Sequence, residues 1–177
     1  MRTAYVNGEF IAEQDAKVSI FDRAFLFADS VYEVTSVLNG KLVDFDNHIE
    51  RLKRSMKELN FGPTINEKEF LTFHRKLVDL NEIKEGIVYL QVSRGIAERD
   101  FAFPDSKTAL TITAFTQKKN LIDNPSVHNG ISIVTIDDLR WKRCDIKTTQ
   151  LLYPSMAKTE AMKQGADDAW MVQNGYV

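Results

Sequence analysis

Residues 31–62, VYEVTSVLNGKLVDFDNHIERLKRSMKELNFG, contain the change of period that decides the fold. Their first half places Asn39-Gly40 between runs rich in β-branched and apolar residues, and this dipeptide is typical of a two-residue hairpin turn. We therefore predict strands over 32–38 and 41–45. The second half changes to helical spacing, because apolar residues recur three or four positions apart: Ile49, Leu52, Met56 and Leu59. A hairpin that runs directly into an amphipathic helix indicates an α+β fold.

The same signals continue on both sides of this stretch. We expect Asp46 or Asn47 to cap the helix and Gly62 to end it. A second Asn-Gly pair predicts an earlier hairpin with strands over 3–6 and 9–12. A second helix is predicted over 66–81, where Asn66 and Glu69 have the spacing of a capping box. Two further strands are predicted over 86–95 and 107–116.

Domain organisation follows from a change in composition at 117–130, which is polar, contains Pro125 and Gly130, and has no hydrophobic period. We therefore expect an N-terminal α+β domain over 1–118, an interdomain linker over 119–130 and the start of a second domain over 131–177. In the second domain we predict a strand over 131–136, a helix over 153–166 and a strand over 168–173. The last strand runs into Asn174-Gly175, so we expect this domain to be incomplete in the sequence.

Composition excludes several classes of function. The 177 residues include 23 basic and 25 acidic side chains, and a net charge of −2 gives no basic footprint for nucleic acid or an anionic membrane. One cysteine, Cys144, excludes an internal disulfide framework, and the three histidines have no metal-ligand spacing, so we expect no metal site. No apolar segment resembles a signal peptide or a membrane span. These features predict a cytoplasmic protein that binds neither nucleic acid nor a membrane.

Lys147 is the first candidate for chemistry, in the segment RWKRCDIKTTQLL at 140–152. Ile146, Leu151 and Leu152 suggest that its amine is partly buried, which disfavours the charged ammonium form. A neutral amine can attack a carbonyl group and form a Schiff base with an aldehyde cofactor or a carbonyl substrate. The alternative is a lysine whose stem is buried and whose amine reaches water.

Three further residues could bind ligands. Arg51 lies beside the apolar stripe of the first helix, and its guanidinium has the donor geometry that phosphate prefers. Arg99 is predicted on a loop between strands, where binding residues concentrate. Tyr32 opens a predicted strand after Asp29-Ser30. The alternatives are solvated arginines and a tyrosine that only packs against its neighbours. We expect Cys144 to be a packing residue, because no histidine is placed to activate it.

Six segments in order resemble the fold-type IV enzymes that use pyridoxal 5'-phosphate, most closely the D-amino acid aminotransferases. They are YVNGEF (5–10), VSIFDRAFLFADSVYEV (18–34), NGKLVDFDNHIERLKRS (39–55), VYLQVSRGIAERDFAFP (88–104), RWKRCDIKTTQLL (140–152) and AKTEAMKQGADDAW (157–170). The resemblance implies that Lys147 holds the cofactor as an internal aldimine and that Arg51 binds its phosphate. It further implies that Tyr32 and Arg99 bind the substrate, that D-alanine-like amino acids and 2-oxo acids are the substrates, and that the protein is a homodimer.

The sequence also departs from the family pattern. Phe101 stands where D-alanine transaminases of this type usually carry a histidine beside the substrate arginine, which leaves the substrate range open. The family's chain continues beyond the position of Val177 into a segment that bears the glutamate paired with the pyridine nitrogen. The alternatives are an aminodeoxychorismate lyase, an (R)-amine or branched-chain transaminase of the same fold, an inactive fragment, and a module that binds a small anion.

Overall fold

The computed structural model describes residues 1–177 and divides them into two compact units. The first unit comprises Met1–Leu121 together with Ile146–Thr149, and the second comprises Ile122–Asp145 and Gln150–Val177. The four residues around Lys147 therefore pack with the first unit, although they lie inside the range 131–177 that we assigned to the second domain. The domain ranges themselves stay a prediction.

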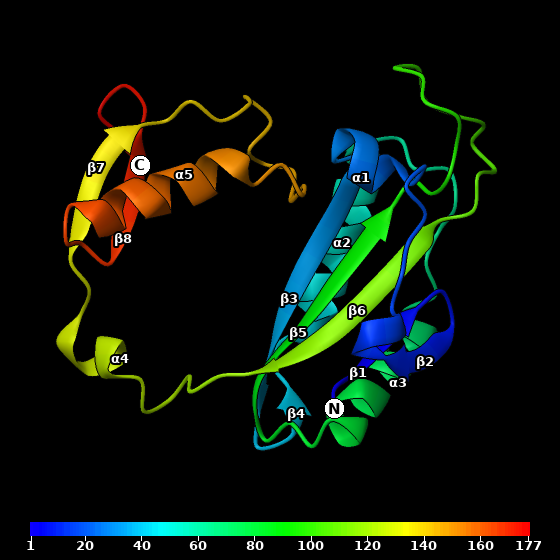
Figure 1. The fold of residues 1–177 in the computed structure, drawn as a ribbon, viewed down its shortest axis with the longest axis horizontal. Helices are drawn as coiled ribbons and strands as arrows, with labels where there is room; N and C mark the ends of the chain where they lie inside the picture. Colours follow the sequence, from blue (N-terminus) through cyan, green and yellow to red (C-terminus); the bar gives the residue numbers. More distant parts are fainter. The chain divides into compact units, whose positions relative to one another are not determined.

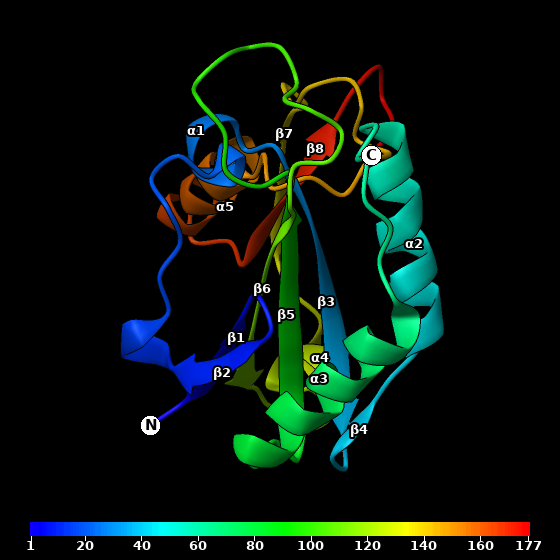
Figure 2. The ribbon, with the colours of Figure 1, turned by 90° about the vertical axis from the view of Figure 1, so that its right-hand side faces the viewer.

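The first unit is built on a six-stranded sheet in the order β2-β1-β6-β5-β3-β4, and every neighbouring pair is antiparallel. Its strands are β1 (Thr3–Val6), β2 (Glu9–Ala12), β3 (Ser30–Leu38), β4 (Lys41–Leu42), β5 (Glu85–Ser93) and β6 (Thr111–Lys118). Two helices, α2 (Phe45–Glu58) and α3 (Glu67–Leu80), cover one face of this sheet (Figures 1 and 2). The predicted α+β class is confirmed.

The hydrophobic core lies between the sheet and these two helices. The apolar stripe predicted for α2 is largely buried, with Leu52 completely inaccessible and Ile49 at 2 % exposure. These residues form one cluster with Phe70, Phe73 and Leu77 of α3 and with alternate residues of the central strands. Helix α2 contacts β3 directly, and Arg51 on its polar flank binds Glu33 of that strand.

The start of α2 differs from the prediction. The strand expected over 41–45 ends at Leu42, and the helix begins at Phe45, with Asp44 rather than Asp46 or Asn47 at the N-cap. Phe45 is 8 % exposed and packs edge-on against His74 of α3, with 5.1 Å between ring centroids. Burial of this aromatic ring therefore favours the earlier start. Asn66 caps α3 as predicted, because its side chain accepts hydrogen bonds from the backbone of Lys68 and Glu69.

Two short elements of the first unit were not predicted. A 3₁₀ turn, η1, covers Glu13–Asp15, and helix α1 covers Arg23–Phe27. Asp22 caps α1 by accepting a hydrogen bond from the backbone N–H of Ala24, and Ala28 ends it in the left-handed conformation at φ 53°. A helix of five residues is too short to show a hydrophobic period, so the pattern of the sequence could not reveal it.

The second unit contains α4 (Pro125–Asn129), β7 (Ile133–Asp137), α5 (Leu152–Lys163) and β8 (Asp168–Val172). Strands β7 and β8 pair in parallel, and α5 packs against both of them. The two strands and the helix predicted here agree with the structure within three residues at each end. Helix α4 falls inside the predicted linker, where Asn124 caps it and Pro125 occupies its first turn. Neither unit contains a helix long and apolar enough to cross a membrane.

Candidate active site

The segment that carries Lys147 is fixed along the edge of β3. The N–H of Tyr32 donates to the carbonyl oxygen of Lys147 at 3.1 Å, and the N–H of Thr149 donates to the carbonyl oxygen of Ser30 at 3.2 Å. Val31 and Thr148 form an antiparallel bridge between these two bonds. Ile146 is 3 % exposed and belongs to the core cluster, so it anchors the segment from the helix side. The backbone of Lys147 therefore has a defined position.

The side chain of Lys147 lies over the ring of Tyr32, with 4.1 Å between Nζ and the ring centroid. Lys147 is half-buried and makes no ion pair or side-chain hydrogen bond within the chain. The partial burial predicted from its neighbours has a different source, because Leu151 and Leu152 are exposed at the start of α5. Burial comes instead from the packing of Ile146 and from the face of Tyr32.

Tyr32 begins a row of aromatic rings on the face of the sheet opposite the two helices. Side chains alternate along β3, so Glu33 points to the helix face and Tyr32 to the other. Tyr32 stacks on Tyr89 of β5 with 5.7 Å between centroids, and Tyr89 stacks on Phe115 of β6 at 4.9 Å. Burial, and to a smaller extent Tyr32, raises the pKa of Tyr89 to about 12. This phenol is therefore a neutral hydrogen-bond donor at physiological pH.

Polar side chains on the same face link Tyr89 to the Lys147 segment. The hydroxyl of Tyr89 donates to Oε1 of Gln91 at 2.9 Å, and Nε2 of Gln91 donates to Oγ of Ser30 at 3.3 Å. Oγ of Ser30 lies 2.5 Å from Oγ1 of Thr149, two residues after Lys147. Sequence reasoning missed Tyr89 and Gln91, although the alternation of the predicted strand 86–95 places both on one face.

Arg51 is held on the flank of α2 by a buried carboxylate. Its Nε and Nη2 donate to the two oxygens of Glu33 at 2.7 and 2.6 Å, and Nδ1 of His48 lies 2.8 Å from Glu33 Oε2. Glu33 is 1 % exposed, whereas the Arg51 side chain is 45 % exposed. These hydrogen bonds to Glu33 raise the pKa of Arg51 above its ordinary value. Glu33 thus fixes the guanidinium plane and leaves Nη1 without a hydrogen bond.

The turn of α2 that follows Arg51 contacts the backbone of Lys147. Ser55 follows Arg51 by four residues, so the two side chains lie on one side of the helix. The buried Oγ of Ser55 accepts a hydrogen bond from the backbone N–H of Lys147 at 3.4 Å. Of the four residues that the sequence singled out, Lys147 contacts Tyr32 directly, and Arg51 binds Glu33, the next residue of β3.

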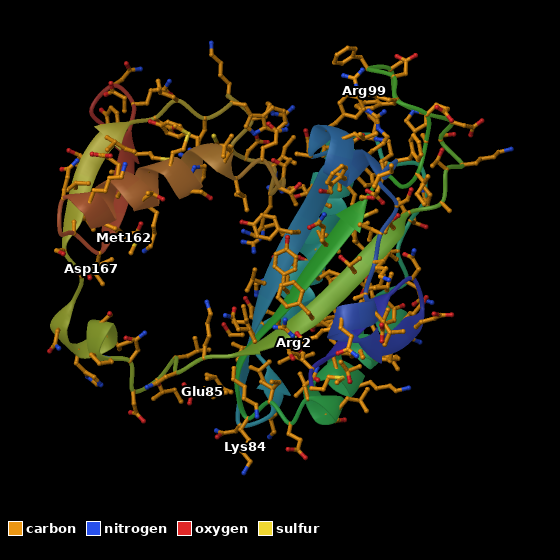
Figure 3. All side chains as sticks on the ribbon, in the orientation of Figure 1. Arg2, Lys84, Glu85, Arg99, Met162 and Asp167 are labelled. Atoms are coloured by element: carbon orange, nitrogen blue, oxygen red, sulfur yellow. The ribbon has the colours of Figure 1, made fainter.

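Arg99, the fourth candidate, lies on the loop between β5 and β6, beyond the end of the sheet and next to α1 (Figure 3). Its guanidinium carbon is 5.5 Å from the ring centroid of Phe27 and 5.4 Å from that of Phe101. Arg99 makes no hydrogen bond or ion pair, and no ring contact joins it to the other three residues. Its donors are free to bind a carboxylate from outside the chain.

These residues fit pyridoxal phosphate. The cofactor presents an aldehyde, which an amine can bind covalently, and a phosphate, which a guanidinium can bind through its planar fork. The Lys147 amine has no competing carboxylate, and Nη1 of Arg51 keeps its two donors on a half-exposed side chain. Lys147 and Arg51 would hold the cofactor through its aldehyde and its phosphate.

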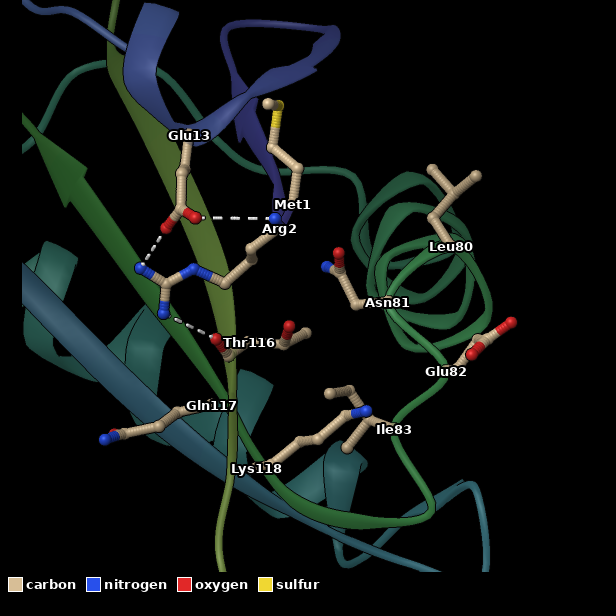
Figure 4. Close-up of a pocket in the computed structure, with 10 residues that line it drawn as sticks. All are labelled: Met1, Arg2, Glu13, Leu80, Asn81, Glu82, Ile83, Thr116, Gln117 and Lys118. Atoms are coloured by element: carbon tan, nitrogen blue, oxygen red, sulfur yellow. Dashed lines mark hydrogen bonds and ion pairs between the residues drawn. The ribbon is translucent and has the colours of Figure 1, made fainter.

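A separate cavity of about 600 Å³ lies at the N-terminal edge of the first unit (Figure 4). Arg2 crosses it, with an ion pair to Glu13 at 2.7 Å and a hydrogen bond from Nη1 to the carbonyl oxygen of Thr116 at 3.0 Å. None of its lining residues is one of the four candidates. Arg2 therefore links η1 to β6, and the cavity is not part of the candidate site.

Comparison with known proteins adds independent information. The family model described as amino-transferase class IV matches residues 30–177. A D-alanine aminotransferase of Staphylococcus aureus (strain MSSA476) is 41% identical over 171 residues, which cover 96% of this chain and 60% of the relative. A D-alanine aminotransferase of Bacillus licheniformis is 38% identical over 173 residues, covering 97% of this chain and 60% of the relative. The chain thus spans about 60% of the length of these curated relatives.

Solved structures share the fold at lower identity. A branched-chain aminotransferase of the thermophilic archaeon Thermoproteus uzoniensis, with norvaline, matches 98% of this chain and 60% of its own, with a TM-score of 0.78 and 19% identity. A putative 4-amino-4-deoxychorismate lyase of Legionella pneumophila matches 92% of this chain and 59% of its own, with a TM-score of 0.78 and 22% identity. The fold therefore accommodates more than one reaction, and the choice between reactions depends on site residues.

Proposed function

The chain belongs to the class IV aminotransferase family, and on that premise we propose that the full-length protein transfers the amino group of a D-amino acid such as D-alanine to a 2-oxo acid. The observation that carries this proposal is the unpaired amine of Lys147, held over the ring of Tyr32. An amine without a carboxylate or hydrogen-bond partner is available to a carbonyl group, with which an amine can form a Schiff base. The similarity to D-alanine aminotransferases supports the choice of substrate.

Each residue of the site has a role in this reaction. Lys147 would hold the cofactor through its amine and, once displaced by the substrate, move a proton from the substrate Cα. Arg51 would bind the cofactor phosphate, with Glu33 fixing the direction of its guanidinium. Bound pyridoxal phosphate would supply the electron sink for the carbanion at that carbon. Arg99 would bind the substrate carboxylate, because its donors have no partner within the chain.

Tyr32 contributes by its position next to Lys147. The face of its ring attracts the ammonium form of the lysine, which keeps Nζ at one place while the proton is carried. The stack with Tyr89 fixes the ring, so Tyr32 cannot turn away from the amine without breaking that contact. Tyr32 would therefore line the substrate pocket and orient the base.

The test uses the full-length protein loaded with pyridoxal phosphate. We expect D-alanine and 2-oxoglutarate to give pyruvate and D-glutamate, with no product from L-alanine. The K147A variant should lose this activity, whereas K142R, a change at an exposed lysine of the same segment, should retain it. Pyruvate formation from aminodeoxychorismate without any 2-oxo acid would instead identify a lyase. Absence of turnover with every D-amino acid would refute the proposal.

A second candidate reaction rests on Phe101. Its ring lies 5.4 Å from the guanidinium carbon of Arg99, so an apolar group stands beside the residue proposed to bind the carboxylate. An apolar neighbour would favour an (R)-amine, which has no carboxylate, as the amino donor. Comparing D-alanine with (R)-1-phenylethylamine as amino donor, both with 2-oxoglutarate as acceptor, separates the two reactions.

We also propose that the full-length protein forms a homodimer. Apolar side chains around α1 and the β5–β6 loop are largely exposed, including Phe25 at 71 %, Ile96 at 54 % and Phe101 at 80 %. Contact with a second copy would remove such a surface from water. Sedimentation velocity should give a single species of twice the chain mass, and a monomer at micromolar concentration would contradict the proposal.

A further inference from the structure

Arg23, at the first position of α1, is a buried arginine with three partners in different parts of the chain. Its side chain is 3 % exposed, and its Nε donates to Oδ2 of Asp29 at 2.7 Å. Its Nη1 donates to the carbonyl oxygen of Asp100 at 2.8 Å and lies 3.4 Å from that of Ala102. These two carbonyl groups flank Phe101, so Arg23 binds the loop immediately after Arg99.

Asp29 is the fixed point of this arrangement. Besides Arg23, its carboxylate accepts two hydrogen bonds from Arg94, at 2.8 Å to Oδ2 and 3.1 Å to Oδ1. Its backbone carbonyl also accepts the N–H of Arg94 at 3.2 Å. Arg94 in turn donates to the carbonyl oxygens of Leu59 and Asn60 at the end of α2. Asp29 is thus tied to the rigid part of the unit, and Arg23 connects that part to the loop.

The carboxylate of Asp29 is shared by the two arginines, and main-chain carbonyl groups and aromatic faces supply their remaining contacts. The guanidinium carbon of Arg94 lies 3.8 Å from the ring centroid of Phe103, and that of Arg23 lies 4.6 Å from the centroid of Phe27. A buried charge needs such partners, and here the loop itself supplies several of them. Folding of the loop over the arginines is therefore favoured by their charge.

Phe27 connects this network to Arg99. One arginine, Arg23, lies over its ring at 4.6 Å, and Arg99 lies 5.5 Å from the same centroid. Phe27 also contacts Phe101 with 5.7 Å between ring centroids. Two rings therefore position Arg99. Phe27 also contacts Arg23, and Phe101 lies between the two residues whose carbonyl oxygens Arg23 approaches. No other polar contact fixes the guanidinium of Arg99.

We propose that Arg23 is a positioning residue for Arg99: its guanidinium, anchored on Asp29, fixes the loop that presents Arg99 to the carboxylate of the amino-acid substrate. This inference rests on the proposed function, because Arg99 is the group that would bind that carboxylate. The side chain of Arg23 is 3 % exposed, so we assign it no direct contact with cofactor or substrate. Its effect on the reaction passes through the position of the loop.

The variant R23K separates the hydrogen-bonding geometry of Arg23 from its positive charge. Lysine keeps the positive charge beside Asp29 but lacks the planar fork, so one ammonium group cannot bind Asp29 and the Asp100 carbonyl in the same geometry. Arg94 still neutralises Asp29 in this variant. The matched control is R75K, at an exposed arginine of α3 for which the structure shows no hydrogen bond.

The first measurement follows hydrogen exchange in the full-length protein. The peptide that contains residues 99–103 should exchange about tenfold faster in R23K than in the wild type, whereas peptides from β3 and β5 should not change. R75K should match the wild type throughout. Unchanged exchange in the loop would overturn the proposal, and this result does not depend on which substrate the enzyme uses.

The second measurement is kinetic and uses D-alanine with the loaded enzyme. R23K should raise KM for D-alanine about tenfold and change kcat by less than about twofold. In an R99M background, adding R23K should change KM by less than about twofold, since the residue through which Arg23 acts is gone. The proposal would be overturned if R23K raised KM by the same factor in the wild type and in R99M. A wild type without D-alanine turnover would refute the proposed function, and loop exchange would still decide the role of Arg23.

Discussion

Replacing His74 by phenylalanine should remove much of the acid sensitivity of the first unit. His74 is 1 % exposed, its Nδ1 lies 2.7 Å from the carbonyl oxygen of Phe70, and its ring stacks on Phe73 at 4.6 Å. Burial lowers the pKa of His74 to about 4, although the hydrogen bond to Phe70 acts in the opposite direction. The folded unit therefore resists protonation that the unfolded chain accepts.

The sign and size of the effect follow from this difference. An unfolded histidine has a pKa of about 6.5, so between about pH 6.5 and 4 the unfolded state binds more protons and the free energy of unfolding falls as the pH falls. Each pKa unit of difference corresponds to about 1.4 kcal/mol, so the full loss, reached well below pH 4, is about 3.5 kcal/mol. At pH 4.5 the loss is about 2.5 kcal/mol, and at pH 7.5 it is close to zero.

Urea unfolding of the wild type and H74F at pH 7.5 and 4.5 measures this effect. Circular dichroism is the appropriate signal, because both tryptophans, Trp141 and Trp170, lie in the second unit. Carboxylates also titrate in this range, so the informative quantity is the difference between the two proteins. H74F should lose about 2.5 kcal/mol less than the wild type on acidification. Equal losses in both proteins would refute the assignment of His74 as a buried neutral histidine.

Three further predictions concern cofactor binding and the core. R51K should raise the Kd for pyridoxal phosphate about tenfold, since lysine cannot bind Glu33 and phosphate with one planar fork; an unchanged absorbance titration would contradict this. G95A should destabilise the first unit by about 2 kcal/mol or more, because a Cβ would lie 1.9 Å from the carbonyl oxygen of Ala109. The control is G8A, where φ is similar but the space around the Cβ is free. Urea unfolding should show that G8A costs only about 1 kcal/mol. L52A should cost about 2–5 kcal/mol, and a smaller loss by urea unfolding would place Leu52 outside the core.

Local pattern was enough to predict most of the regular elements. The strands β1 and β2 have the predicted bounds because an Asn-Gly turn fixes where each strand ends. The helix α2 was predicted from its apolar period, but its first turn was misplaced because Phe45 is drawn into the core by contacts with α3 that are distant in sequence. Short elements such as α1 were missed because five residues cannot display a period.

The site was predicted less completely, for a physical reason. Its residues are connected by contacts between distant parts of the chain, such as the pairing of the Lys147 segment with β3. Glu33 sits on the buried face of a strand, and its contacts with Arg51 and His48 explain a carboxylate there. Cys144, expected to pack, is exposed and donates its thiol to the carbonyl oxygen of Trp141. Sequence pattern names candidate side chains, whereas their partners depend on tertiary structure.

The role of Lys147 is tested most directly by finding which lysine binds the cofactor. The full-length protein would be incubated with pyridoxal phosphate, reduced with borohydride, digested and mapped by mass spectrometry. We expect one reduced pyridoxyl adduct, on Lys147, in the wild type and in K142R, and none at that position in K147A. An adduct confined to another lysine, or no adduct in the wild type, would contradict this expectation.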